Sequence, residues 1–103
     1  HCALAGRKLD VLRANARACA TIVPDHSLVR GSRACGFSMN YRSAMVFGPV
    51  REVSDPEDKR RGMEAVMRAA AGDDAPVDFG PDGLDRVVIL ALAAERMTGK
   101  QHL

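Results

Sequence analysis

Large aromatic side chains are scarce in this sequence of 103 residues, which contains no tryptophan, one tyrosine and three phenylalanines. Apolar residues still make up 47% of the chain, which argues against an intrinsically disordered protein. Because alanine, valine, leucine and methionine dominate this apolar set, much of the core must be built from small side chains. That composition leaves room for a partner or a ligand to supply bulk.

Cysteine is also scarce, and its positions exclude two common kinds of site. Cys2, Cys19 and Cys35 are odd in number and include no close pair, so they form neither a disulfide framework nor the paired spacing of a zinc site. The three histidines are likewise scattered without ligand spacing. We therefore expect free thiols in a reducing compartment, which predicts a cytoplasmic protein without a metal site.

Strong charge asymmetry is absent too, since the net charge is only +2. The densest basic run, residues 59–61, follows two acidic residues and is typical of a solvated helix face. No aromatic residues interleave it, so a platform for stacking nucleic-acid bases is unsupported. No apolar run is long enough to span a bilayer. Neither nucleic acid nor a membrane is therefore expected as a partner.

The apolar patterns predict one small α+β domain. Apolar residues recur at helical spacing from Arg7 to Ala16, which predicts a short amphipathic helix. Residues 17–23 are apolar at both alternating sets of positions, which predicts a strand buried on both faces or a barrel wall, ended by Pro24. The polar segment from Asp25 to Arg33 is expected to be a loop.

Residues 34–53 are expected to be mostly extended. One face of this strand carries Tyr41, Ser43, Met45 and Phe47, and the other carries Arg42, Ala44 and Val46. Gly48-Pro49 interrupts the run, which predicts a bulge or a bend. Two long strands with a glycine bend suit a small antiparallel barrel.

A second helix is predicted after this strand, with Ser54 as its cap, Pro56 in its first turn and Gly72 at its end. Its methionine-containing apolar stripe indicates core packing, with a partner groove as the alternative. Residues 73–85 are rich in glycine and proline and are expected to be a loop. The β-branched start of residues 86–94 favours a last strand.

Gly6-Arg7-Lys8 points most directly to chemistry. Gly6 opens a turn, and Arg7 and Lys8 follow where the first turn of a helix should lie. Free backbone N–H groups and the positive end of the helix dipole make that position unfavourable for cations. A bound phosphate would resolve the conflict. The alternative is that Arg7 and Lys8 are solvated surface residues.

Several motifs in order resemble one family. The first half shows His1, then Gly6-Arg7-Lys8-Leu9, then Leu12 and Asn15 before an apolar strand; the second shows Tyr41-Arg42-Ser43, Val46-Phe47-Gly48, Val53, Asp55 to Lys59 and the closing Thr98-Gly99-Lys100. This pattern resembles the FMN-binding split barrels of the pyridoxamine 5′-phosphate oxidase type, with the 5-nitroimidazole-resistance proteins as the nearest branch. The resemblance covers nearly the whole chain.

The resemblance implies an α+β, mainly β fold: an antiparallel split β-barrel with short helices covering it. Residues 1–103 would then be a single, partial FMN-binding domain, with the N-terminal strands of the family domain ahead of His1. It also implies a homodimer that holds FMN between its subunits. The tryptophan that true pyridoxamine-phosphate oxidases use near their C-terminus is absent, which argues against a vitamin B6 oxidase.

The resemblance also assigns residues to the cofactor. The family's phosphate-binding turn corresponds to Gly6, Arg7 and Lys8, and Ser43 corresponds to a polar residue facing the flavin or its ribityl chain. His1 matches a histidine near the flavin, although it is also simply the first residue of the chain. The expected cofactor-binding set is His1, Gly6, Arg7, Lys8, Tyr41, Arg42 and Ser43.

The resemblance further implies an FMN-dependent oxidoreductase acting on a small molecule, in which the flavin performs the redox chemistry. No side chain is evident as a general acid or base, so no catalytic residue is assigned. Two alternatives stay open. One is a flavin or haem carrier without turnover, since a fold does not settle a function. The other is a structural fragment.

Overall fold

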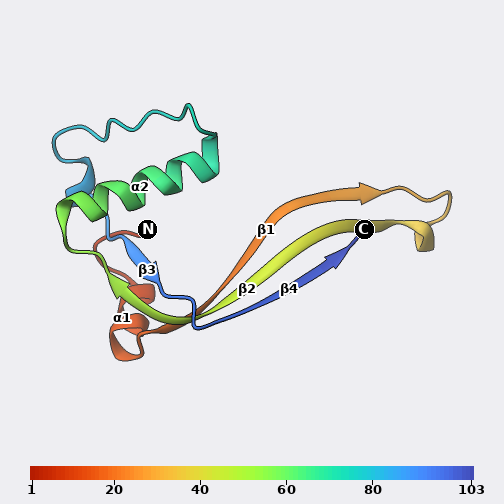
Figure 1. Ribbon diagram of the computed structural model, residues 1–103, viewed down its shortest axis with the longest axis horizontal. Coiled ribbons are helices and arrows are strands. Elements are labelled where there is room, and N and C mark those ends of the chain that lie inside the picture. Colours follow the sequence, from red (N-terminus) through yellow and green to blue (C-terminus); the bar gives the residue numbers. More distant parts are fainter. The chain divides into compact units, whose positions relative to one another are not determined.

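The structure is a computed structural model that describes all 103 residues and is mainly antiparallel β-sheet with two α-helices (Figure 1). Its elements in chain order are α1 (Arg7–Ala14), β1 (Arg17–Val29), β2 (Ser38–Glu52), α2 (Pro56–Ala71), β3 (Leu90–Leu92) and β4 (Arg96–His102). Short 3-10 helices lie at Ala34–Gly36 and Gly83–Arg86. The predicted α+β class with a dominant antiparallel sheet is confirmed.

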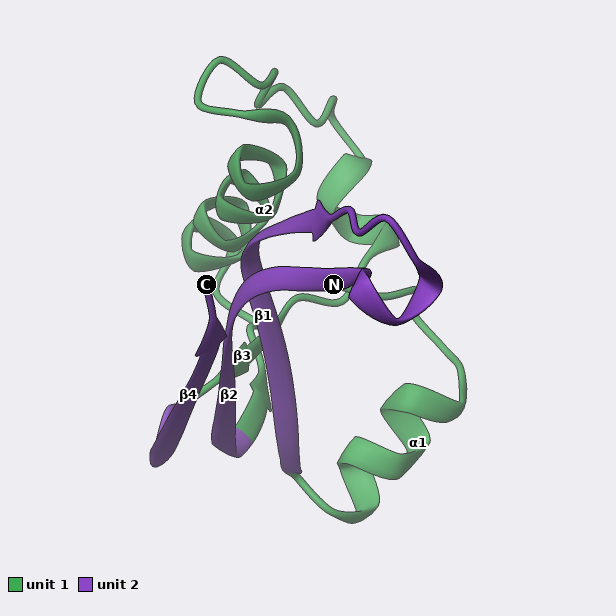
Figure 2. Cartoon of the chain, turned by 90° about the vertical axis from the view of Figure 1, so that its right-hand side faces the viewer, with its two compact units in different colours: residues 1–16, 50–92 green, residues 17–49, 93–103 purple.

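The chain divides into two compact units, coloured separately in Figure 2. Unit 1 consists of His1–Ala16 and Val50–Leu92, and unit 2 consists of Arg17–Pro49 and Ala93–Leu103. The long strand β2 contributes to both units. Neither helix combines the length and the apolar sequence that crossing a membrane would require.

Unit 2 is a three-stranded antiparallel sheet in which β2 lies between β1 and β4 (Figure 1). Tyr41 of β2, for example, is directly opposite His26 of β1 and His102 of β4. Because β1 and β4 pair only with β2, the sheet stays open at both of its edges.

The two faces of this sheet are those that the sequence alternation predicts. Directly opposed residues share a face, so Met45 lies with Thr21 and Thr98, and Val46 lies with Ala20 and Met97. Val46 is the buried hydrophobic residue of this unit, with 7% of its surface exposed.

Of the two alternatives predicted for residues 17–23, a strand buried on both faces or a barrel wall, burial on both faces is wrong. Ile22 and Val23 are 53% and 50% exposed. The reason is that β1 is an edge strand, and unit 2 contains no α-helix or second sheet to cover it. A strand that is apolar at every position can be covered by another element or left exposed, and its sequence alone does not distinguish the two.

The prediction that Pro24 ends the strand and that Asp25 begins a loop is also wrong. β1 continues to Val29, and its pairing with β2 shifts register between Ile22 and Asp25. An edge strand tolerates proline at such an irregularity, because the missing N–H is not required by the ladder. Proline therefore marks a bulge here.

Of the bulge or bend predicted at Gly48-Pro49, the bulge is absent, since Ala18 opposes Gly48 and Arg17 opposes Pro49 without a shift of register. The glycine has a different role: a Cβ atom added there would lie 1.8 Å from the carbonyl oxygen of Ala93. Gly48 therefore allows the close passage of the chain that leads into β4.

Unit 1 contains α1, α2, the end of β2 and the short strand β3, and its most buried side chains are Leu9, Ile89 and Val53. Val53 donates its backbone N–H to the carbonyl of Ile89 at 2.9 Å. Helix α2 packs closely on the same residue, since a Cβ atom added at Gly62 would lie 2.9 Å from the Ile89 side chain. The predicted strand over residues 86–94 is confirmed only as β3.

Helix α2 begins one residue later than predicted, so Ser54 is not its cap. Asp55 is the N-cap, and its carboxylate accepts a hydrogen bond of 3.0 Å from the backbone N–H of Asp58. The reason is that Pro56 occupies the first helical position, where proline is favoured. Gly72 ends the helix with a positive φ of 95°, as predicted.

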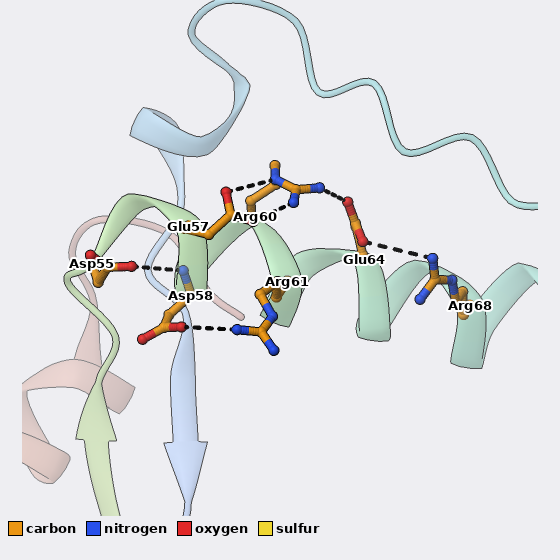
Figure 3. A network of polar contacts seen from close by, with 7 residues as sticks. All are labelled: Asp55, Glu57, Asp58, Arg60, Arg61, Glu64 and Arg68. Atoms are coloured by element: carbon orange, nitrogen blue, oxygen red, sulfur yellow. Dashed lines mark hydrogen bonds and ion pairs between the residues drawn. The ribbon is translucent and has the colours of Figure 1, made fainter.

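The exposed side of α2 carries a chain of ion pairs (Figure 3). Arg60 lies between Glu57 and Glu64, and Arg68 pairs with Glu64 at 3.7 Å. These pairs are three or four residues apart, which is the spacing that brings helix side chains together. The basic run at residues 59–61 is therefore a solvated helix face, as predicted.

Candidate functional site

The N-terminus of α1 lacks the side-chain cap that a helix start usually has. Gly6 is the N-cap residue, with φ 146° and ψ 168°, and no side chain accepts a hydrogen bond from the first turn. A φ in this region is accessible almost only to glycine. The first backbone N–H groups of α1 therefore remain available to an outside acceptor.

Two cations occupy this uncapped start, because Arg7 and Lys8 are the first two helical residues. Both side chains are exposed. Neither forms an ion pair, whereas Arg13, in the last turn of the same helix, binds Glu52 at 2.7 Å. A Cβ atom placed on Gly6 would meet no atom within 4 Å, so the space beside the turn is open.

The other helix of unit 1 shows the ordinary arrangement. Helix α2 starts with a carboxylate cap and has Glu57 and Asp58 in its first turn, so negative charge stands at the positive end of the dipole. Helix α1 instead begins with Arg7 and Lys8 and has no side-chain cap, and its one acidic first-turn residue, Asp10, comes after both cations. Its combination of free N–H groups, a guanidinium and an ammonium suits a phosphate, so the residues present fit the phosphate group of FMN.

His1 also belongs to unit 1 and is exposed. Its neighbour Cys2 forms an isolated antiparallel bridge with Val88, with N–H to carbonyl distances of 2.9 and 2.8 Å. This bridge fixes the backbone next to His1, while the His1 side chain makes no hydrogen bond. Its role near a flavin stays a prediction.

The other predicted site residues lie on β2 in unit 2, on two different faces. Tyr41 and Ser43 share one face, whereas Arg42 lies on the opposite face by strand alternation. There, Arg42 stands 3.6 Å from the carboxylate of its cross-strand neighbour Asp25. Tyr41 and Ser43 can therefore contact one ligand on their face, and Arg42 belongs to a separate environment.

The sheet brings Lys100 to the Tyr41 and Ser43 face, which the sequence reasoning did not assign to the site. Lys100 of β4 is directly opposite Ser43, and its ammonium lies 6.0 Å from the centre of the Tyr41 ring. The closing Thr98-Gly99-Lys100 motif could have indicated this lysine. Because no strand was predicted over residues 96–102, nothing in the sequence indicated that the motif pairs with β2.

Both carboxylates of unit 2 already have arginine partners. Glu95 accepts a hydrogen bond of 2.5 Å from Arg17, and Asp25 faces Arg42. The hydrogen bond from Arg17, with its charge, lowers the pKa of Glu95 below its ordinary value and raises the pKa of Arg17. Because six cationic residues share this unit with only two carboxylates, it carries an excess of positive charge.

A protein-family model described as pyridoxamine 5′-phosphate oxidase matches residues 1–101. No curated protein matches the sequence. The match with the family model covers almost the entire chain, including every residue of the expected cofactor site.

The solved structures similar to the chain include the following two. One is a protein from Bacteroides thetaiotaomicron assigned to 5-nitroimidazole antibiotic resistance, with 29% identity, a TM-score of 0.70, and coverage of 94% of this chain and 56% of that one. The other is the flavocytochrome Anf3 from Azotobacter vinelandii, with 20% identity, a TM-score of 0.64, and coverage of 98% and 48%. The chain thus spans about half the length of each structure.

Proposed function

Because the chain belongs to the pyridoxamine 5′-phosphate oxidase family, with its open antiparallel split-barrel fold, we propose that it is a flavin-binding protein whose flavin is FMN. One observation carries this proposal: the uncapped start of α1, where Arg7 and Lys8 stand without carboxylate partners. A phosphate satisfies the free N–H groups and both charges at once. Riboflavin, which lacks the phosphate, cannot.

Within this proposal, residues 1–103 act as one FMN-binding domain. Gly6, Arg7 and Lys8 of unit 1 hold the phosphate, and His1 of the same unit stays a candidate flavin contact. Tyr41, Arg42 and Ser43 of unit 2 stay candidates from the family resemblance alone. The bound flavin supplies the redox chemistry, and the protein supplies binding and orientation. The function is then that of a cytoplasmic, FMN-dependent oxidoreductase acting on a small molecule, similar to the nitroimidazole-resistance branch.

A second candidate is a flavin or haem carrier without turnover. It is favoured by the lack of any buried polar or charged side chain, since strongly perturbed acids and bases usually require burial. The two candidates differ in one measurement. A reduced nicotinamide cofactor bleaches the absorbance of bound flavin if it is the electron donor of an oxidoreductase, and leaves a carrier that accepts no electrons yellow.

The test of the phosphate site is a fluorescence titration of the protein with FMN and, separately, with riboflavin. Replacing Arg7 and Lys8 together by alanine should weaken FMN binding roughly ten- to a hundredfold, because exposed charge pairs contribute less than buried ones. Riboflavin binding should be weak and nearly unchanged.

The matched control replaces Arg30 and Arg33 by alanine. This removes the same charge from two exposed arginines without ion pairs, in the segment between β1 and β2. FMN affinity should be retained in this control. Equal loss in both double variants would indicate a nonspecific charge effect, and unchanged affinity in the Arg7 and Lys8 variant would return both cations to the solvated surface.

A further inference from the structure

A shallow hollow lies beside Lys100 on the face of the sheet that carries Tyr41 and Ser43. It has a volume of about 330 Å³ and is lined by Ser43, Met45, Thr98, Gly99 and Lys100. The register explains this lining, because Ser43 opposes Lys100 and Met45 opposes Thr98 on adjacent strands. Two hydroxyl groups, an ammonium group and a flexible apolar side chain therefore converge on one small volume.

Lys100 has no anionic partner within unit 2. The carboxylates of Asp25 and Glu95 are engaged by Arg42 and Arg17, and they are the only two side-chain carboxylates in this unit. The ammonium of Lys100 lies 6.0 Å from the centre of the Tyr41 ring, which is the outer limit for a cation–π contact. The charge of Lys100 is thus left available on the side where the hollow opens.

We propose that this hollow binds the carboxylate end of a small organic acid, which rests on the proposed function because the acid would be the substrate presented to the flavin. Lys100 pairs with the carboxylate, Ser43 and Thr98 donate hydrogen bonds to it, and its apolar body lies against Met45 and Tyr41. The hollow is large enough for a single-ring or short-chain acid and too small to enclose a nucleotide.

A second hollow of about 420 Å³ shares Ser43, Gly99 and Lys100 with the first and adds Arg42 and Gln101. Arg42 already faces the carboxylate of Asp25 at 3.6 Å, so an acid bound there would have to compete with that carboxylate. The lining of the first hollow includes no residue that is paired with a carboxylate, which favours it as the acid site.

The test uses benzoate as the probe and its uncharged analogue benzamide as the reference, with binding followed by NMR chemical shifts of the 103-residue protein. Benzoate should bind more tightly than benzamide and shift the amides of Ser43, Thr98 and Lys100. Lys100→Met should weaken benzoate binding about three- to tenfold, as expected for an exposed charge pair, and leave benzamide unchanged. Lys100→Arg should retain binding.

Lys59→Met in α2 is the matched control, because it removes the same charge from another lysine without an ion pair. FMN titrations of the Lys100 variants separate this inference from the proposed function. FMN affinity unchanged by Lys100→Met, with benzoate affinity lost, supports the acid subsite. Loss of FMN affinity would make Lys100 a flavin contact, and equal binding of benzoate and benzamide would show that no charge is recognised; either result overturns the inference.

Discussion

A Cβ atom on Gly48 would lie 1.8 Å from the carbonyl oxygen of Ala93, although 45 positions separate these two residues in the chain. The atom in the way is backbone, so it cannot move aside as a flexible side chain would. The same stretch is held by hydrogen bonds from Ala93 to Pro49 at 3.0 Å and from Glu95 to Phe47 at 2.9 Å. Gly48 therefore permits the chain to enter β4 beside β2.

Gly48→Ala is expected to destabilise the protein by about 1–3 kcal/mol, as overpacking does when backbone must shift. Gly99→Ala is the control in the same sheet, because its nearest neighbour, the carbonyl oxygen of Ser43, would be 3.8 Å away. The Gly99 variant should be close to the wild type or slightly more stable. Urea denaturation compares the stability of the two variants. Equal midpoints for Gly48→Ala and Gly99→Ala would show that no close approach exists at Gly48.

The cap of α2 gives a second prediction, in which two adjacent residues should behave differently. Asp55→Ala removes the acceptor for the Asp58 N–H and should cost about 1 kcal/mol of stability. Ser54→Ala should be nearly neutral, because Ser54 makes no capping hydrogen bond. Thermal denaturation followed by circular dichroism compares the two. A larger loss from the Ser54 variant would move the start of the helix back to the position that the sequence pattern predicts.

Local sequence patterns predict the strand faces and the helix starts of this fold well. The alternation of Tyr41, Ser43, Met45 and Phe47 predicted the two faces of β2 correctly, since strand geometry alone places every second side chain together. The turn at Gly6 and the helix after it were predicted because local signals determine them. The exact cap was not, because serine and aspartate are equally good caps and only the position of Pro56 separates them.

The errors concern pairing between distant segments. β4 has a polar sequence without an apolar stripe, and all of its residues are exposed, so only its hydrogen bonds to β2 define it as a strand. The predicted strand end at Pro24 is wrong because proline interrupts a central strand but is tolerated in an edge strand such as β1. The Lys100 side of the candidate site was missed for the same reason, since the lysine reaches Ser43 only through β4.

The Arg17–Glu95 pair predicts a pH dependence. Because its pKa is lowered in the folded state, Glu95 contributes stability that is present above its ordinary pKa of 4.5 and is lost as the pH falls through the lowered value. An NMR titration should find the carboxyl of Glu95 below 4.5, and Arg17→Gln should bring it back toward that value. Glu57, whose pKa is lowered by Arg60, should titrate unchanged in this variant and is the internal control. The same pKa for Glu95 in both proteins would mean that the pair does not form in solution.

The last prediction concerns the face of unit 2 opposite Tyr41. Ile22 and Met97 are 53% and 62% exposed there, on either side of the buried Val46, and exposed apolar side chains that lie together mark contact surfaces. We propose that a second copy of the chain covers this face, which gives the homodimer that the family resemblance implies. Sedimentation at micromolar concentration should then show a dimer.

Met97→Glu should shift the protein to a monomer, because the dimer would have to bury an unpaired charge. Val77→Glu places the same charge on an apolar residue 40% exposed in the loop after α2 and should leave the dimer intact. A monomeric wild type, or a dimer that tolerates Met97→Glu as well as it tolerates Val77→Glu, would show that this face is not the contact.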